Sequence, residues 1–104
     1  MIITTTDFVA GKKVKEVMGI VRGNTIRARH VGHDILAGLQ QIIGGELQSY
    51  TKMLTDTRNQ ATERMVAEAE KLGADAVINV RYASSDIMPG AAEILAYGTA
   101  VKLD

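Results

Sequence analysis

Apolar residues recur every three or four positions between residues 50 and 72, with polar residues at most of the positions between them. Such a spacing lines up apolar side chains along one side of an α-helix. The stretch therefore predicts a long amphipathic helix whose single apolar stripe packs on a sheet. The stripe consists of Leu54, Ala61, Met65, Ala69 and Leu72.

Three other stretches are typical of β-strands. Residues 14–22 are apolar on both faces, and Gly23-Asn24 is expected to end this first main strand. Residues 73–82 alternate with a period of two after a glycine and predict the middle strand. The last strand is predicted over residues 93–103.

The remaining segments predict shorter pieces. Residues 2–5 are mostly β-branched and indicate a strand too short to stand alone. Residues 26–31 fit either a short extended piece or a loop. The middle and last strands are expected to be joined through residues 84–86 and Pro89-Gly90.

A second helix of about three turns is predicted over residues 34–43. Asp34 is expected to cap its first turn, because a short carboxylate accepts hydrogen bonds from unpaired backbone amides. Gly44-Gly45 is expected to end it. Its apolar positions are Ile35, Leu36, Leu39, Ile42 and Ile43.

The last strand has two apolar faces of different character. One carries large side chains such as Leu95 and Val101, and the other carries small ones, including Ala96, Gly98 and Ala100. A helix backbone can come close to such a row of small residues, so we expect Gly98 to lie under the long helix.

The order of elements predicts an α+β fold, a two-layer β-α-α-β-β unit with an antiparallel sheet and both helices on one face. A right-handed crossover gives the strand order first, last, middle. Two helices cover one face of a three-stranded sheet, so the other apolar face of the last strand is expected to be covered by self-association.

Composition limits the classes of site. The chain has no cysteine, which excludes disulfides, thiolate metal sites and thiol catalysis. The first seven residues lack a basic, apolar leader pattern, and no apolar run approaches the ~20 residues of a membrane span. We expect a cytoplasmic protein that does not enter a membrane.

Net charge is zero but unevenly spread. Six basic residues face two acidic ones in the first 29 positions, so this segment is +4 and the remainder −4. A solvated surface, a self-complementary assembly and an anion or nucleic-acid surface all fit this pattern. Nucleic acid is the weakest of these partners, because no helix-turn-helix, zinc finger or set of stacking aromatics accompanies the charge.

His30 and His33 are the only histidines, and with Asp34 they form the candidate metal site. Two imidazoles and a carboxylate suit a divalent transition metal such as zinc or copper. The alternative is a pair of surface histidines without a metal, because structural zinc sites use four ligands. No serine lies in a nucleophile-elbow pattern and no catalytic constellation is visible, so an enzyme is not expected.

Several short motifs occur in a specific order along nearly the whole chain, and together they resemble the YbjQ-like family of small bacterial proteins. They are Gly19-Ile-Val-Arg-Gly23, Asp34-Ile-Leu-Ala-Gly38, Ile43-Gly-Gly45, Tyr50, Leu72-Gly-Ala-Asp-Ala-Val77 and Tyr97-Gly-Thr-Ala-Val101. The resemblance implies a single domain over residues 1–104, a dodecin-like β-α-β-β unit, a homopentameric ring and a heavy-metal-binding label. This sequence departs from the family pattern at Asn79, where glycine is common, and at His30 and His33.

These observations order the functional hypotheses. A homo-oligomeric, pentameric structural or small-ligand-binding protein comes first, and a heavy-metal-binding protein using histidines and carboxylates comes second. An anion or nucleic-acid binder acting through the basic N-terminal segment comes third.

Overall fold

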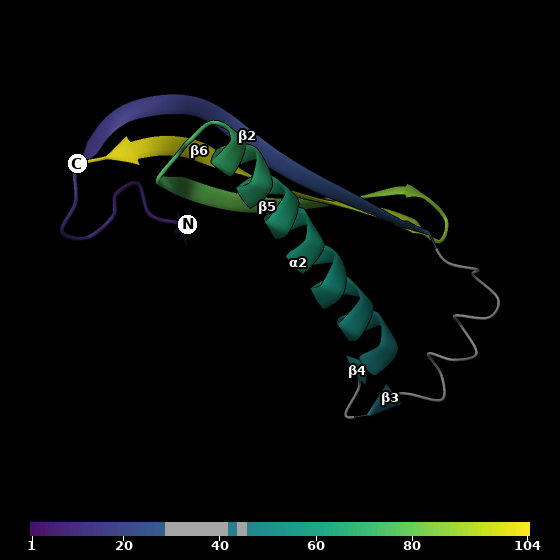
Figure 1. The fold of residues 1–104 in the computed structure, drawn as a ribbon. Coiled ribbons are helices and arrows are strands. Elements are labelled where there is room, and N and C mark those ends of the chain that lie inside the picture. Colours follow the sequence, from purple (N-terminus) through teal and green to yellow (C-terminus); the bar gives the residue numbers. More distant parts are fainter. Residues whose placement is uncertain (29–41, 44–45) are drawn as a thin grey trace.

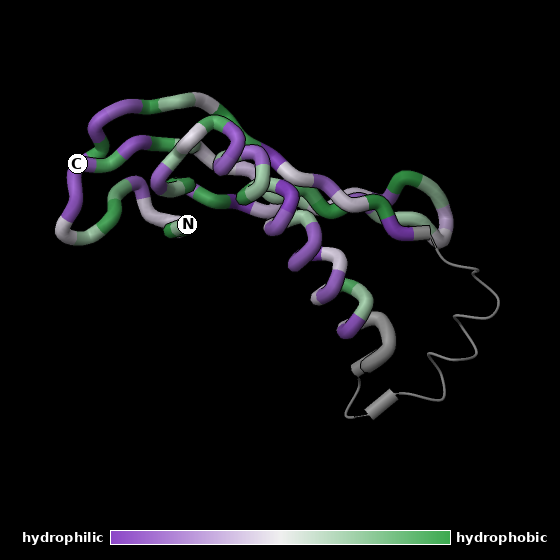
Figure 2. The backbone as a smooth tube through the Cα atoms, viewed as in Figure 1, coloured by the Kyte–Doolittle hydropathy of each residue, from purple (hydrophilic) through white to green (hydrophobic). Residues whose placement is uncertain are grey.

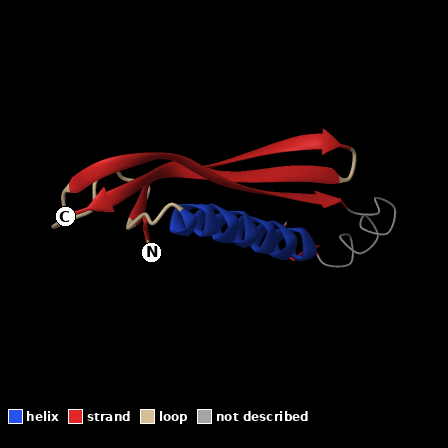
Figure 3. Cartoon of the chain, turned by 45° about the horizontal axis from the view of Figure 1, so that its top comes forward, coloured by secondary structure: helices blue, strands red, loops and turns tan. Residues whose placement is uncertain are grey.

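A computed structural model describes residues 1–28, 42–43 and 46–104. One long helix, α2 (Gln48–Lys71), packs against one face of a four-stranded sheet, so this part of the chain forms two layers (Figures 1 and 3). The sheet contains β1 (Ile2–Ile3), β2 (Val14–Ala28), β5 (Ala76–Met88) and β6 (Ala91–Leu103). A small pair, β3 (Ile42–Ile43) and β4 (Glu46–Leu47), precedes the helix.

The strand order is β1-β5-β6-β2, which confirms the predicted α+β class and the predicted order of first, last and middle strands. β6 runs antiparallel to both β2 and β5, so these two outer partners are parallel to each other. The sheet is mixed rather than antiparallel, because β1 joins β5 in parallel. Beyond β1, the Thr4 amide donates to the Val77 carbonyl and the Val80 amide donates to the Thr4 carbonyl, both at 3.0 Å.

Two strands are longer than the sequence predicts. β2 continues through Gly23-Asn24 to Ala28, and β5 continues through residues 84–86 to Met88, so both predicted breaks are wrong. The reason is tertiary structure: β6 pairs with β2 along its whole length and with β5 from Ala91 to Val101. Those pairings satisfy the backbone and override the local turn preference. Between β5 and β6 the chain reverses at Pro89-Gly90, where Gly90 has a φ of 80°.

The predicted short helix over residues 34–43 is wrong at its end, because Ile42–Ile43 forms strand β3. Both residues are β-branched and pair with β4, which suits an extended backbone better than a helical one. Residues 34–41, including the proposed cap Asp34, lie outside the described residues.

The long helix is confirmed over nearly its predicted length, and its C-terminal end has a clear cause. Gly73 adopts a φ of 78°, its amide donates to the Glu70 carbonyl, and the Ala74 amide donates to the Ala69 carbonyl at 3.1 Å. These two bonds form a Schellman motif, which satisfies carbonyls that a helix end would otherwise leave unpaired.

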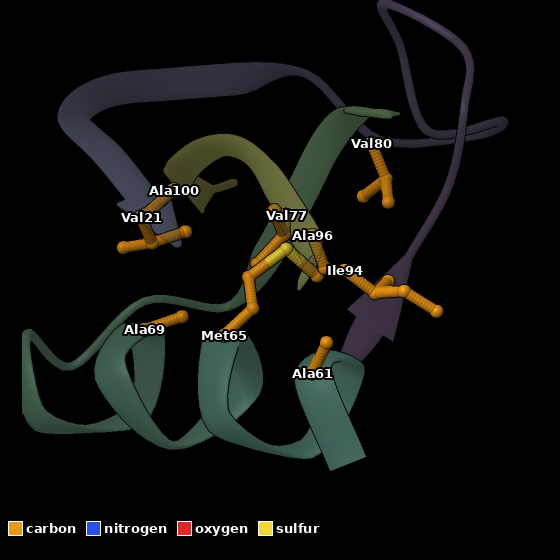
Figure 4. Close-up of a cluster of buried hydrophobic side chains, with 9 residues drawn as sticks. All are labelled: Val21, Ala61, Met65, Ala69, Val77, Val80, Ile94, Ala96 and Ala100. Carbon is orange, nitrogen blue, oxygen red and sulfur yellow. The ribbon is translucent and has the colours of Figure 1, made fainter. Parts of the chain in front are cut away.

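The main core lies between the helix stripe and the sheet (Figure 4). Its members are Val21, Ala61, Met65, Ala69, Val77, Val80, Ile94, Ala96 and Ala100. The predicted match of helix alanines to the small residues of the last strand is therefore confirmed. The two ends of the predicted stripe are not in this core: Leu54 is 39% exposed and Leu72 is 46% exposed.

The helix backbone comes close to the sheet at Gly23 rather than at Gly98, so the predicted role of Gly98 is wrong. A Cβ at Gly98 would lie 2.7 Å from Val77 Cγ1 and 2.9 Å from the Ile78 carbonyl oxygen, both on β5. A Cβ at Gly23 would instead meet the α2 backbone at Ala61 and Met65. The helix thus sits over β2 at a position where no side chain intervenes.

Asn79 occupies a β-bulge in β5 with a φ of 52°, the left-handed region that favours glycine. Asparagine tolerates this region better than residues with larger Cβ substituents, which pay roughly 1–2 kcal/mol there. We therefore expect Asn79→Gly to keep or raise the free energy of unfolding, and Asn79→Val to lower it by about 1–2 kcal/mol. Urea denaturation at a fixed protein concentration measures both, and equal stabilities for the two variants would contradict the assigned conformation.

Candidate functional site

The face of the sheet that points away from α2, called here the open face, carries large apolar side chains in solvent. Alternation along β2 places Val21, Gly23 and Thr25 under the helix and sends their neighbours to the open face. Figure 2 shows this mixture of apolar and polar positions along the strands. The most exposed apolar residues of β2 are Val17 at 65%, Ile20 at 66% and Ile26 at 57%.

The N-terminal segment covers only one end of the open face. Ala76, Ile78 and Val101 form a second buried cluster there, with Val9 and Leu103 packed against it. This corrects the expectation that one whole face of the last strand is left in water. Further along β2, the apolar side chains have no comparable cover from the described residues.

A row of two arginines and a tyrosine crosses the middle of the open face. Tyr97 on β6 pairs with Arg22 on one side and with Arg81 on the other. Arg81 Nη1 donates to the carbonyl oxygens of Thr5 and Val80, both at 2.9 Å. No hydrogen bond or ion pair joins the Arg22 guanidinium to another described residue, so it is available to an acceptor on a second molecule.

The outer side of α2 is acidic along one line. Asp56, Glu63 and Glu70 are exposed and lie seven residues apart, which is close to two helical turns. This line faces away from the sheet, because the buried positions of the helix lie on its other side. The two surfaces therefore differ in character: the open face has a free arginine, and the helix has a row of carboxylates.

A hollow of about 180 Å³ lies between the first half of α2 and the far half of β5. Polar groups from both elements line it, and Tyr82 is held in place by a 2.8 Å hydrogen bond between its hydroxyl and Thr62 Oγ1. The remaining wall is apolar. The lining residues are Leu54, Arg58, Tyr82, Ala83, Ser84 and Ile94.

The sequence did not point to this hollow. Its strand side includes Ser84, which lies in the segment predicted to be a connection, and its helix side includes Leu54, predicted to be core. The one available signal is the i, i+4 spacing of Leu54 and Arg58, which places an apolar and a cationic side chain on the same side of a helix.

All three candidate metal ligands, His30, His33 and Asp34, lie outside the described residues. Among residues 1–28, 42–43 and 46–104 there is no group of three or more histidine, cysteine, aspartate or glutamate residues that could hold a metal ion. The described part of the chain therefore does not itself fit a heavy-metal site. No helix within it is long and apolar enough to cross a membrane.

Comparison with known proteins gives a consistent family assignment. A UPF0145 protein of Archaeoglobus fulgidus is 61% identical over 103 residues, covering 99% of this chain and 95% of its own length. A UPF0145 protein of Thermotoga maritima is 62% identical over 104 residues, covering 100% of this chain and 98% of its own length. The Archaeoglobus relative shows that the family is not confined to bacteria.

A solved structure shares the fold at low sequence identity. It is the crystal structure of a protein of unknown function from Pediococcus pentosaceus, assigned to the DUF74 family. It matches with a TM-score of 0.72 and 18% identity, covering 100% of this chain and 98% of that chain. The family model described as "Putative heavy-metal-binding" matches residues 1–104. The chain therefore belongs to the YbjQ-like family.

Proposed function

We propose that the protein works as a homo-oligomer, a pentameric ring, with a structural or small-ligand-binding role rather than a catalytic one. The observation that carries the proposal is the open face, where Val17, Ile20 and Ile26 are each more than half exposed. Large apolar side chains gathered on one sheet face mark an interaction surface. Burying each contributes roughly 1.5–3 kcal/mol, so a partner that covers them gains substantial free energy.

A second copy of the chain is the partner that the charges favour. The open face offers the unpaired Arg22 guanidinium, and the outer side of α2 offers Asp56, Glu63 and Glu70. A contact between different surfaces of neighbouring copies repeats from copy to copy, and it closes into a ring when the rotation between copies is a whole fraction of a turn. This arrangement brings the basic N-terminal segment of one copy toward the acidic segment of the next.

The mass of the untagged protein in solution tests the proposal directly. If the open face forms the interface between copies in a ring of five, replacing one of its apolar residues by a charged residue lowers the mass of the particle.

Heavy-metal binding is the second candidate, and the family description is what favours it. With no cysteine in the chain, His30 and His33 are the only imidazole or thiolate donors, so a site for zinc, copper or nickel that uses such donors requires them. We expect no heat when zinc, copper or nickel is titrated into metal-stripped, untagged protein at neutral pH. Heat in the parent that disappears in both His30→Ala and His33→Ala would contradict this expectation and establish a histidine site.

A further inference from the structure

We propose that the hollow between α2 and β5 binds a small carboxylate with an apolar or aromatic body. This inference rests on the ligand-binding part of the proposed function and names the chemical class of the ligand. The lining residues belong to α2, β5 and β6.

Two polar groups of the hollow are free to bind a ligand. No hydrogen bond or ion pair joins the Arg58 guanidinium or the Ser84 hydroxyl to another described side chain. Both residues are exposed, one on the helix and one on the strand, and they line the same hollow. The guanidinium presents a planar fork of N–H donors, which matches the two oxygens of a carboxylate.

Tyr82 forms part of the wall of the hollow, and its hydroxyl proton is not available to a ligand. Thr62 Oγ1 donates its one proton to the Arg58 carbonyl oxygen at 2.9 Å. The hydrogen bond between Thr62 Oγ1 and the Tyr82 hydroxyl must then use the tyrosine proton. The ring of Tyr82 is thereby held in one orientation, and its face is suited to stack against an aromatic or flat apolar ligand.

The remaining wall and the size of the hollow restrict the ligand further. Leu54 and Ile94 present hydrocarbon, which disfavours a strongly hydrated ion such as phosphate. Arg58 is the one cation among the described residues that line the hollow, so it matches a single negative charge. A volume of about 180 Å³ corresponds to about six water molecules at roughly 30 Å³ each, which suits a ligand about the size of benzoate.

The test is a titration of the untagged full chain with benzoate, followed by amide chemical shifts in NMR spectra. We expect saturable shifts at Arg58 and at residues 82–84. Benzamide, which has nearly the same shape without the charge, and inorganic phosphate, which has charge without an apolar body, are expected to bind at least about tenfold more weakly. Phosphate binding as tight as benzoate, or no benzoate shifts at 10 mM, would overturn the proposal.

Two substitutions and one matched control separate a specific site from general charge attraction. Arg58→Met should weaken benzoate binding roughly 10- to 100-fold, the range expected for losing a charge-assisted hydrogen bond. Ser84→Phe should abolish binding by filling the hollow. Arg64→Met is the control, because that guanidinium lies outside the hollow and donates to the Asn24 carbonyl at 2.6 Å. Equal affinity in Arg58→Met and Arg64→Met would also overturn the proposal.

The outcome is distinguishable from a failure of the assembly proposal. Light scattering on the same samples reports the oligomeric mass, and the folding of each variant is checked by circular dichroism. A monomer that binds benzoate through Arg58 would support the ligand site and contradict the ring. A pentamer that does not bind benzoate would support the ring and contradict the ligand site.

Discussion

Replacing Gly23 by alanine is expected to destabilise the protein strongly, although it adds only one methyl group. A Cβ at this position would overlap the Ala61 carbonyl oxygen and the Met65 amide nitrogen, and would lie 2.7 Å from Arg64 Cβ. Two of these three atoms belong to the helix backbone, which cannot rotate out of the way. The whole helix must move away from β2, which loosens the core beneath it.

The expected change in the free energy of unfolding is opposite in sign to the change usual for this substitution. In an ordinary strand, Gly→Ala stabilises by roughly 0.5–1 kcal/mol, because alanine loses less backbone entropy on folding. At position 23 we expect a loss of about 3 kcal/mol, at or beyond the upper end of typical overpacking costs. Urea denaturation measures it, with Asn24→Ala on the opposite face as the control. A Gly23→Ala variant at least as stable as the parent would show that the helix does not approach β2 at this residue.

Replacing Ile20 by glutamate is expected to break the assembly into single chains. Ile20 is 66% exposed on the open face, so a glutamate there is solvated in the monomer and costs little. At an interface the same carboxylate, opposite Thr99 on β6, must be desolvated. The free cation of the open face, Arg22, is the group that the proposed contact pairs with the carboxylates of the neighbouring copy, so a glutamate at position 20 competes for it and adds a like charge to that contact. An uncompensated buried charge costs roughly 3–5 kcal/mol, which weakens each contact by more than a hundredfold.

The control for this substitution is Phe8→Glu. Phe8 is also a large, exposed apolar side chain, 57% exposed against 66% for Ile20. It lies in the N-terminal segment between β1 and β2 and not on a strand of the sheet. Light scattering at micromolar concentration should return the parent mass for Phe8→Glu and the monomer mass for Ile20→Glu. If both variants kept the parent mass, the open face would not be the interface.

The sequence predicts the fold well where periodicity is strong and fails where tertiary contacts decide. The stripe through Ala61, Met65 and Ala69 needs no context to indicate a helix, and its small residues correctly predict contact with Ala96 and Ala100. Gly23-Asn24 has the local signature of a turn. In the structure the glycine is instead part of a strand, and its missing side chain makes room for the α2 backbone.

The candidate sites show the same limit. The hollow depends on Arg58 and Ser84 lining the same space from the two layers, although they are far apart in sequence and the pattern at residues 84–86 predicts a connection rather than a strand. The unpaired Arg22 in the cross-strand row with Tyr97 becomes visible only once the register is known. The predicted metal ligands His30, His33 and Asp34 lie outside the described residues, so that hypothesis depends on titration.

If the open face joins copies of this chain into a ring, the native mass of the parent protein shows it most directly. Five chains of 11.2 kDa give about 56 kDa. We predict that native mass spectrometry of untagged protein, supported by light scattering at micromolar concentration, will return this mass. A single species at 11.2 kDa under the same conditions would contradict the account.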